Sequence, residues 1–205
     1  MAQVWYVSYG SNMSTARLAA YLQGGRPSGG SRRNPGARDR TLPARAVPVD
    51  LPGTVYFAGD SPQWGGGVAF YDHDEPGRTA ARGYLVSAEQ LADIASQEMY
   101  RPVGEGDPLA DLLREPLLGG RHELGPGRYE TLLEVGRSDG LPLLTFTAPH
   151  GIDHVPHSRP SPAYLALVAE GLRESRGWDH EQVAAYLATI VRPEQRGVVT
   201  RPARG

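Results

Sequence analysis

A single carboxylate, Glu98, stands in an apolar stripe of the sequence, and that position favours general acid/base chemistry. Three apolar residues precede it at the spacing of one helix face, Leu91, Ile94 and Ala95. Glu98 therefore points into the core or into a cavity at the core's edge. Desolvation at such a place raises the pKa of a carboxyl group above the ~4.3 of a free Glu, toward neutral pH. The alternative is an exposed Glu98 at a frayed helix end, or one paired with Arg101.

The second feature with chemical potential is a tight turn near the N-terminus. Bulky residues at positions 4–7 predict a strand that ends at Gly10, and the cap-type residues Ser11, Asn12 and Ser14 follow where a helix begins. Glycine permits close approach of a ligand to the backbone, and a helix N-terminus directs free N–H groups toward it, so the turn suits an anionic group. A purely conformational role for these residues is the alternative.

The turn belongs to a longer motif. Tyr6-x-x-Tyr9-Gly10-Ser11-Asn12, followed by Met13, resembles the signature loop of the gamma-glutamylcyclotransferase family, which commonly reads Tyr-x-x-Tyr-Gly-Ser-Asn-Leu. Two further matches follow. Glu98 stands where the family's catalytic Glu is expected, one helix after the strand at 82–86. The run at 160–164, Pro-Ser-Pro-Ala-Tyr, resembles the family's Pro-Ser-x-x-Tyr element, whose Tyr reaches the active site. The resemblance covers about residues 4–190.

The resemblance implies an α+β fold, with a small, mixed, barrel-like β-sheet and helices packed around it. It also implies an intramolecular acyl transfer without a cofactor, in which a γ-glutamyl amide releases 5-oxoproline and a free amine or amino acid. Glu98 would be the general acid/base, and the turn's N–H groups would hold the substrate carboxylate or the oxyanion. The substrate-binding residues implied are Tyr6, Val7, Ser8, Tyr9, Gly10, Ser11, Asn12 and Tyr164.

The chain departs from the family at the helix that carries Glu98. Family members often have Leu-Asp-x-x-Glu there, whereas this chain has Ile94-Ala95-Ser96-Gln97-Glu98. The departure leaves the acid/base in place but removes a polar neighbour, and it leaves open which amine is released. A ligand-binding or regulatory module of the same fold, without turnover, is the alternative function.

The elements that must position these residues are readable from caps and periodicity. Ser87 and Gln90 form a capping box for the Glu98 helix, and further helices are predicted at 14–23, from Ser161-Pro162 to Gly177, and from Asp179 to about 190. Short strands are predicted at 44–49, 54–58, 67–71 and 80–86, with a meander or barrel spacing. A hairpin is predicted at 129–135 and 141–148 around Ser138-Asp139-Gly140.

Two other segments carry weaker chemical signals. One segment holds four residues of the types that bind metals: His150, Asp153, His154 and His157. A zinc amidohydrolase that uses them is a further alternative function. The prolines and the glycine among them, however, forbid a regular helix and favour a solvated loop. Residues 26–45 hold six Arg against one acidic residue and predict a solvated loop, in which one Arg could face the ligand.

The whole chain reads as one domain, residues 1–205, with an insertion at 99–127 that contains a short helix from Asp107 through Leu117. That helix could be a lid, a cavity wall or an added surface helix. The net charge of -2 argues against a nucleic-acid partner. With no cysteine, disulfides, thiolate zinc sites and cysteine nucleophiles are excluded.

No leader and no membrane span are evident, so we expect a cytoplasmic protein whose partner is a small γ-glutamyl substrate. No cofactor or metal is expected, and the oligomeric state is left open. All 21 basic residues are Arg, which we interpret as the codon usage of a GC-rich bacterial genome.

Overall fold

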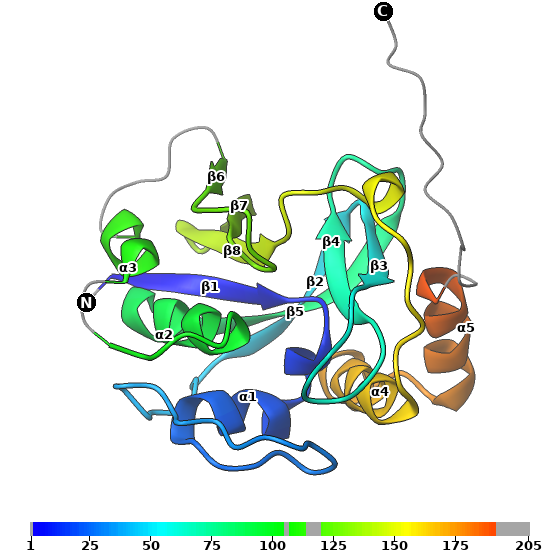
Figure 1. The fold of residues 1–205 in the computed structure, drawn as a ribbon, viewed down its shortest axis with the longest axis horizontal. Coiled ribbons are helices and arrows are strands. Elements are labelled where there is room, and N and C mark those ends of the chain that lie inside the picture. Colours follow the sequence, from blue (N-terminus) through cyan, green and yellow to red (C-terminus); the bar gives the residue numbers. More distant parts are fainter. Residues whose placement is uncertain (1, 105–106, 114–119, 192–205) are drawn as a thin grey trace, which may run out of the picture.

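The computed structural model describes residues 2–104, 107–113 and 120–191. One six-stranded mixed sheet forms the centre, in the order β2-β5-β1-β8-β7-β6, and β3 and β4 form a separate two-stranded sheet (Figure 1). The strands are β1 (Gln3–Ser8), β2 (Ala46–Pro52), β3 (Thr54–Ala58), β4 (Val68–Asp72), β5 (Arg78–Ser87), β6 (Arg121–Glu123), β7 (Thr131–Ser138) and β8 (Leu141–Thr147). The α+β class and the mixed sheet expected from the sequence are confirmed.

The sheet is mixed because β1 lies antiparallel to β5 and parallel to β8. Tyr6 is opposite Tyr84 on β5 and Leu144 on β8, so the first strand of the chain is held on both sides by strands from far along it. The predicted meander is not observed: β2 pairs with β5 rather than with β3, which follows it directly. The β7–β8 hairpin is confirmed, and its turn has positive φ at both Asp139 and Gly140, as a tight hairpin turn requires.

The helices are α1 (Thr15–Gln23), α2 (Ala88–Glu98), α3 (Pro108–Leu112), α4 (Pro162–Arg176) and α5 (His180–Ile190), with two short 3-10 turns, η1 (Ser11–Met13) and η2 (Ile152–His154). The capping box predicted at Ser87 is present, and a second capping box forms at Asp179, where a helix start is predicted. Ser161 caps α4, Pro162 starts it, and Gly177 ends it in the left-handed conformation.

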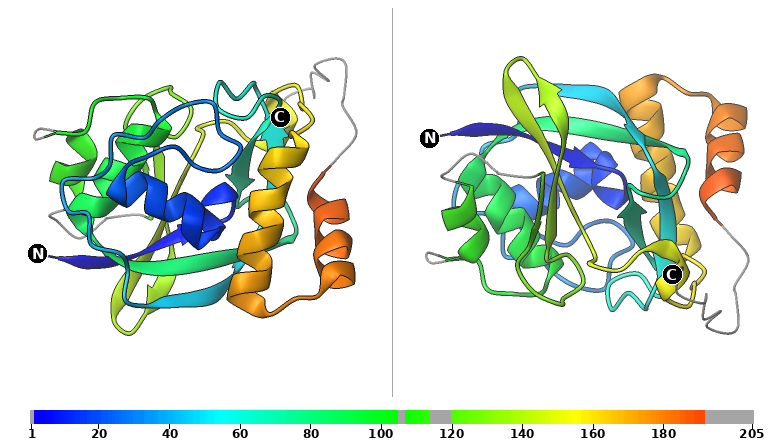
Figure 2. Two further views of the ribbon diagram at one scale, coloured as in Figure 1. Left: turned by 90° about the horizontal axis from the view of Figure 1, so that it is seen from below. Right: turned by 90° about the horizontal axis from the view of Figure 1, so that it is seen from above.

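Two apolar cores lie on the two faces of the central strands. In the first, Leu18 and Leu22 of α1 and Leu91 and Ile94 of α2 pack with Tyr6. In the second, residues of α4 and α5 pack with Val7 and with β2, β3 and β4. The alternation along β1 therefore sends Tyr6 to one core and Val7 to the other. Figure 2 shows α1 and α2 together near one end of the sheet, and α4 and α5 side by side at the other.

Helix α3 ends at Leu112, and the rest of the helix predicted through Leu117 falls mainly outside the described residues. Leu109 and Leu113 are buried beside α2. The assignment of residues 99–127 as an insertion stays a prediction. Among the helices that the structure describes, none has both the length and the hydropathy that crossing a membrane requires.

Candidate functional site

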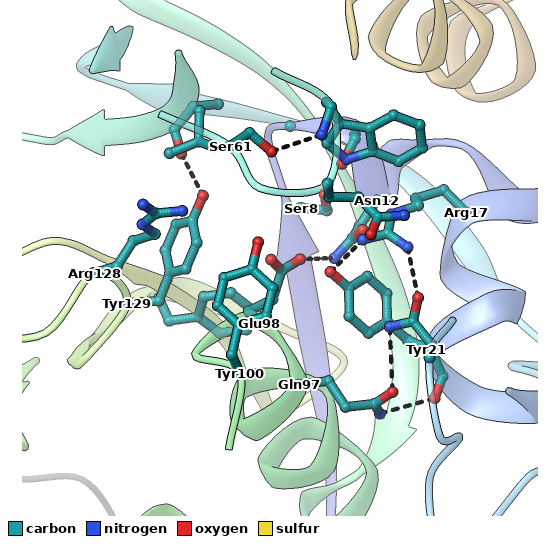
Figure 3. A pocket seen from close by; sticks show the side chains of 18 of the residues that line it. Ser8, Asn12, Arg17, Tyr21, Ser61, Gln97, Glu98, Tyr100, Arg128 and Tyr129 are labelled. Atoms are coloured by element: carbon teal, nitrogen blue, oxygen red, sulfur yellow. Dashed lines mark hydrogen bonds between the residues drawn. The ribbon is translucent and has the colours of Figure 1, made fainter. Parts of the chain in front are cut away.

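A cavity of about 160 Å³ lies where the end of β1, η1, α1, the end of α2 and the start of α4 meet (Figure 3). Of the predicted site residues, Tyr6, Ser8, Tyr9, Gly10, Ser11, Asn12, Glu98 and Tyr164 all line it. Three stretches that are far apart in the sequence thus contribute to one wall. The cavity is the place in the described structure where the residues of all three sequence motifs come together.

Val7 is the exception, because it is predicted to bind substrate but the structure places its side chain away from the cavity. It does not line the cavity, and its side chain is fully buried in the core beneath α4 and α5. The reason is the two-residue period of a strand, which sends Tyr6 and Ser8 to one face and Val7 to the other. A motif read as a continuous run cannot make this distinction.

Glu98 is the last residue of α2 and is half-buried at the cavity wall. Its Oε1 accepts a hydrogen bond of 2.8 Å from Nδ2 of Asn12, which also donates to the hydroxyl of Tyr6 at 3.0 Å. The ion pair considered for Glu98 is not formed, because Arg101 pairs with the buried carboxylate of Glu130. The carboxylate of Glu98 is therefore fixed by a neutral amide and stays available for proton transfer.

The turn after β1 is shaped by a close approach of α4. A Cβ built on Gly10 would lie 2.7 Å from the hydroxyl of Tyr164, so no larger residue fits there without displacing that side chain. The N–H of Ser11 donates to the same hydroxyl at 3.4 Å. Burial, with a further contribution from Glu98, raises the pKa of Tyr164, so the phenol stays protonated and can donate.

Two buried polar atoms in the cavity have no hydrogen-bond partner among the described residues. One is Oδ1 of Asn12, and the other is Nε of Arg17. Buried polar groups are normally satisfied, and leaving one unpaired costs about 1–3 kcal/mol. A hydrogen-bond donor of a ligand would therefore fit at Oδ1 of Asn12, beside Glu98. A hydrogen-bond acceptor of a ligand would fit at Nε of Arg17, on α1.

Five arginines line the cavity, and sequence reasoning assigned none of them to the site: Arg17, Arg32, Arg33, Arg101 and Arg128. Arg17 shares a helix face with Tyr21, at i and i+4, and lies over its ring at 4.1 Å. That spacing on a helix next to the turn was the signal that could have revealed it. Figure 3 shows Glu98 between Asn12 and Arg17 on one side and Arg128 and Tyr129 on the other.

Arg32 and Arg33 reach the cavity because their loop is tied down. Arg38 makes a two-pronged contact with the buried carboxylate of Asp93 on α2, and Gln90 donates to the backbone carbonyls of Asp39 and Thr41. Nothing in the composition of residues 26–45 indicates which Arg is tethered and which faces the ligand. The sequence allows one Arg of this loop to face the ligand. In the structure two of them, Arg32 and Arg33, line the cavity.

The histidine loop makes structural contacts elsewhere. Nδ1 of His150 is 2.9 Å from the hydroxyl of Tyr56, and Nε2 of His157 is 3.0 Å from the carbonyl oxygen of Ile152. Within the described ranges, no group of three or more His, Asp or Glu residues is placed to hold a metal ion. The geometry thus gives the zinc alternative no support.

Comparison with models of known protein families finds no match. Among curated proteins, the chain is similar to histone deacetylase 5 of Arabidopsis thaliana, with 29% identity over 202 residues. That match covers 92% of this chain but only 31% of the plant protein, so the chain spans about a third of that relative's length.

Solved structures resemble the chain along nearly its whole length. One is the crystal structure of the uncharacterized human protein loc79017, with a TM-score of 0.55, 15% identity, and coverage of 96% of this chain and 92% of that one. Another is a gamma-glutamyl cyclotransferase, with a TM-score of 0.54, 15% identity, and coverage of 94% and 89%. At this identity the likeness concerns the fold: the chain has the fold of a gamma-glutamyl cyclotransferase.

Proposed function

We propose that the protein converts a γ-glutamyl amide into 5-oxoproline and a free amine, with Glu98 as general acid and base. The observation that carries this proposal is the position of Glu98, held by Asn12 at 2.8 Å in a cavity also lined by the turn and by Tyr164. The shared fold of a gamma-glutamyl cyclotransferase supports it. Fold alone does not determine chemistry, so the proposal depends on the site.

The substrate's α-ammonium is the group that Glu98 must deprotonate. In the proposed complex it lies between the carboxylate of Glu98 and the unpaired Oδ1 of Asn12, which accepts one of its hydrogens. The freed amine attacks the γ-carbonyl carbon of the same molecule, and a C–N bond forms in a five-membered ring. Because both groups belong to one molecule, folding the substrate into this geometry supplies much of the rate.

The tetrahedral intermediate carries an oxyanion, which needs hydrogen-bond donors. The N–H groups of the turn and the protonated hydroxyl of Tyr164 are the donors at this wall of the cavity. Glu98 then returns its proton to the leaving nitrogen, the original amide C–N bond breaks, and the amine departs. After the attack the ring nitrogen still holds two hydrogens, and it gives the second proton to Glu98, which passes it to the departing amine. The amine thus leaves as an ammonium, two protons are taken and two are given, and Glu98 ends each cycle as the carboxylate that began it.

A screen of γ-glutamyl amides for release of 5-oxoproline tests the proposal. The screen should include γ-glutamyl amino acids, a γ-glutamyl peptide and a γ-glutamyl polyamine, with the matching α-glutamyl compounds as controls, since these cannot close the ring through the same bond. We expect release from at least one γ-glutamyl compound and from no α-glutamyl compound. If no compound turns over while one binds, the module without catalytic activity becomes the better description.

A further inference from the structure

The charge of the cavity indicates what kind of amine leaves. Five guanidinium groups line the cavity, against the single carboxylate of Glu98. Arg101 is paired with Glu130, outside this cavity. In the part of the chain that the structure describes, the other four arginines have no carboxylate within ion-pair distance.

Three of these four arginines, Arg17, Arg32 and Arg128, are oriented by neutral partners that leave their charge uncompensated. Nη1 of Arg17 donates to Oδ1 of Asn34 at 3.0 Å, and Nη2 of Arg128 donates to the carbonyl oxygen of Asp60 at 2.9 Å. The guanidinium of Arg32 lies 4.5 Å from the centre of the Tyr100 ring. Neutral acceptors and a ring face position a cation without cancelling it, so the cavity keeps a positive potential.

Arg17 gives the strongest indication of a ligand. Arg17 is only 4% exposed, and its Nε has no hydrogen-bond partner among the described residues. A buried cation is normally paired with an anion, because removing it from water is expensive. An anionic ligand group in the cavity would satisfy both its charge and its free N–H.

A second hollow, of about 250 Å³, adjoins the cavity and shares Glu98, Tyr100, Arg101 and Arg128 with it. Glu98 can therefore give its proton to a leaving nitrogen whose remaining atoms extend past Arg128. The space accommodates more than a small amine. Its walls also include Glu130, whose charge is matched by Arg101.

We propose that the leaving amine is polyanionic: an acidic amino acid or a short acidic peptide with at least two carboxylates. This inference rests on the proposed reaction. The γ-glutamyl unit itself brings one ammonium, which faces Glu98, and one carboxylate, which a single guanidinium balances. The remaining guanidinium groups match carboxylates of the leaving group, and a polyamine leaving group would be repelled.

Binding to the Glu98→Gln protein tests the inference separately from turnover. We would titrate this variant by calorimetry with γ-glutamylglutamate, γ-glutamylglutamine and γ-glutamylputrescine. γ-Glutamylglutamine is almost the same size as γ-glutamylglutamate but carries one negative charge fewer. At low ionic strength we expect γ-glutamylglutamate to bind at least about fivefold more tightly than γ-glutamylglutamine, as for one partly screened ion pair. The preference should shrink in about 0.5 M salt.

Substitutions at the cavity rim identify the charges responsible. Arg32→Ala and Arg128→Ala should each reduce the preference to about twofold or less, because each removes one guanidinium. Arg128 lines both hollows, and Arg32 lines the first and lies over the ring of Tyr100, which lines both. Arg26→Ala is the matched control, since Arg26 is an exposed residue of the same loop that lines neither hollow. Its preference should equal that of the parent protein.

Equal binding of γ-glutamylglutamine, tight binding of γ-glutamylputrescine, or no binding of γ-glutamylglutamate would each overturn the inference. The reaction is judged by a separate measurement, 5-oxoproline release by the wild-type protein. Retained preference for γ-glutamylglutamate without any release would support the anionic ligand class and count against the chemistry.

Discussion

At the scale of single residues, the contact between Asn12 and Glu98 sets the expectations for catalysis. Glu98→Gln keeps the shape of the side chain but removes the group that exchanges a proton, so we expect kcat to fall by at least about a hundredfold, as for loss of a general acid/base. The fold and much of the affinity for the substrate should remain. Glu89→Gln, on the same helix but in contact with Arg38, is the control and should keep full activity. Wild-type kcat in Glu98→Gln would rule out Glu98 as the acid/base.

The hydroxyl of Tyr164 gives a second expectation at this scale. Tyr164→Phe removes a donor at the oxyanion side of the cavity, so kcat/KM should fall roughly tenfold, which equals about 1.4 kcal/mol of transition-state stabilisation. The melting temperature should change little, because the ring still packs edge-on against Phe57.

Tyr186→Phe provides the comparison for Tyr164. It also removes a phenol hydroxyl, in this case a half-buried one that accepts a hydrogen bond of 3.1 Å from the N–H of Ala80 and does not line the cavity. It should lower stability by about 1 kcal/mol and leave the kinetics unchanged. If Tyr164→Phe behaves in the same way as this variant, Tyr164 is a packing residue.

Residues that carry a motif could be predicted from the sequence, and residues that reach the site by tertiary packing could not. Asn12, Glu98 and Tyr164 all line the cavity, as their motifs implied. Arg32 and Arg128 do so only because a loop is tethered to α2 and because the segment before β7 lies near Asp60. Such placements depend on contacts between distant segments, which local composition does not record.

At the scale of elements, α4 is pressed against the turn that forms the cavity wall. A Cβ built on Gly171 would lie 2.3 Å from Cβ of Met13 and 2.7 Å from the backbone nitrogen of Ser14. Glycine inside a helix costs up to about 1 kcal/mol relative to alanine, so its presence here is explained by the close packing.

Gly171→Ala should therefore be harmful despite its better helix propensity. We expect a loss of about 1–3 kcal/mol in the free energy of unfolding, from overpacking, together with a lower kcat/KM, because the turn must shift. Chemical denaturation and kinetics of the same preparation measure both. Ala185→Gly, in the exposed face of α5, is a control that lowers helix propensity and should leave activity unchanged. Higher stability in Gly171→Ala would contradict the packing described.

The contact between the histidine loop and β3 predicts a pH dependence. Burial, and next the charge of His154, lower the pKa of His150 below its ordinary 6.5. The unfolded chain therefore takes up this proton at a higher pH than the folded protein does. The stability contributed by neutral His150 is present above pH 6.5 and is lost as the pH falls through the lower folded value.

Melting temperatures measured from pH 7.5 to pH 5 check this expectation. The wild-type protein should lose more thermal stability over that interval than His150→Gln, which has no imidazole at this position to protonate. His73→Gln is the matched control, because His73 lies in an exposed turn and pairs with Asp74. An identical pH profile for wild type and His150→Gln would exclude this contribution.

Elements with a local signature were the easiest to predict. The capping boxes at Ser87 and Asp179 and the Asp139-Gly140 turn specify their own geometry within four residues, and all three are present. The strand β6 was missed because it is three residues long and has no turn chemistry of its own. The pairing of β2 with β5 was missed because the sequence of a strand does not specify which other strand it pairs with.

At the scale of the whole molecule, the absence of a metal group among the described residues leads to an expectation for activity. Once a substrate is identified, chelators should leave kcat and KM unchanged. Dialysis against a chelator followed by metal analysis and assay makes the test. Stoichiometric zinc in active protein, lost together with activity, would overturn it and bring the histidine loop back as a site.

The position of β1 at the centre of the sheet affects the order in which the protein can assemble during synthesis. β1 leaves the ribosome well before its neighbours β5 and β8, and Tyr164 follows later still. Most of its contacts span long stretches of chain, which slows folding and leaves an apolar strand unpaired while translation continues. A nascent chain stopped before β8 should therefore remain sensitive to protease and dependent on chaperones, although it already contains the whole Tyr-Gly-Ser-Asn turn.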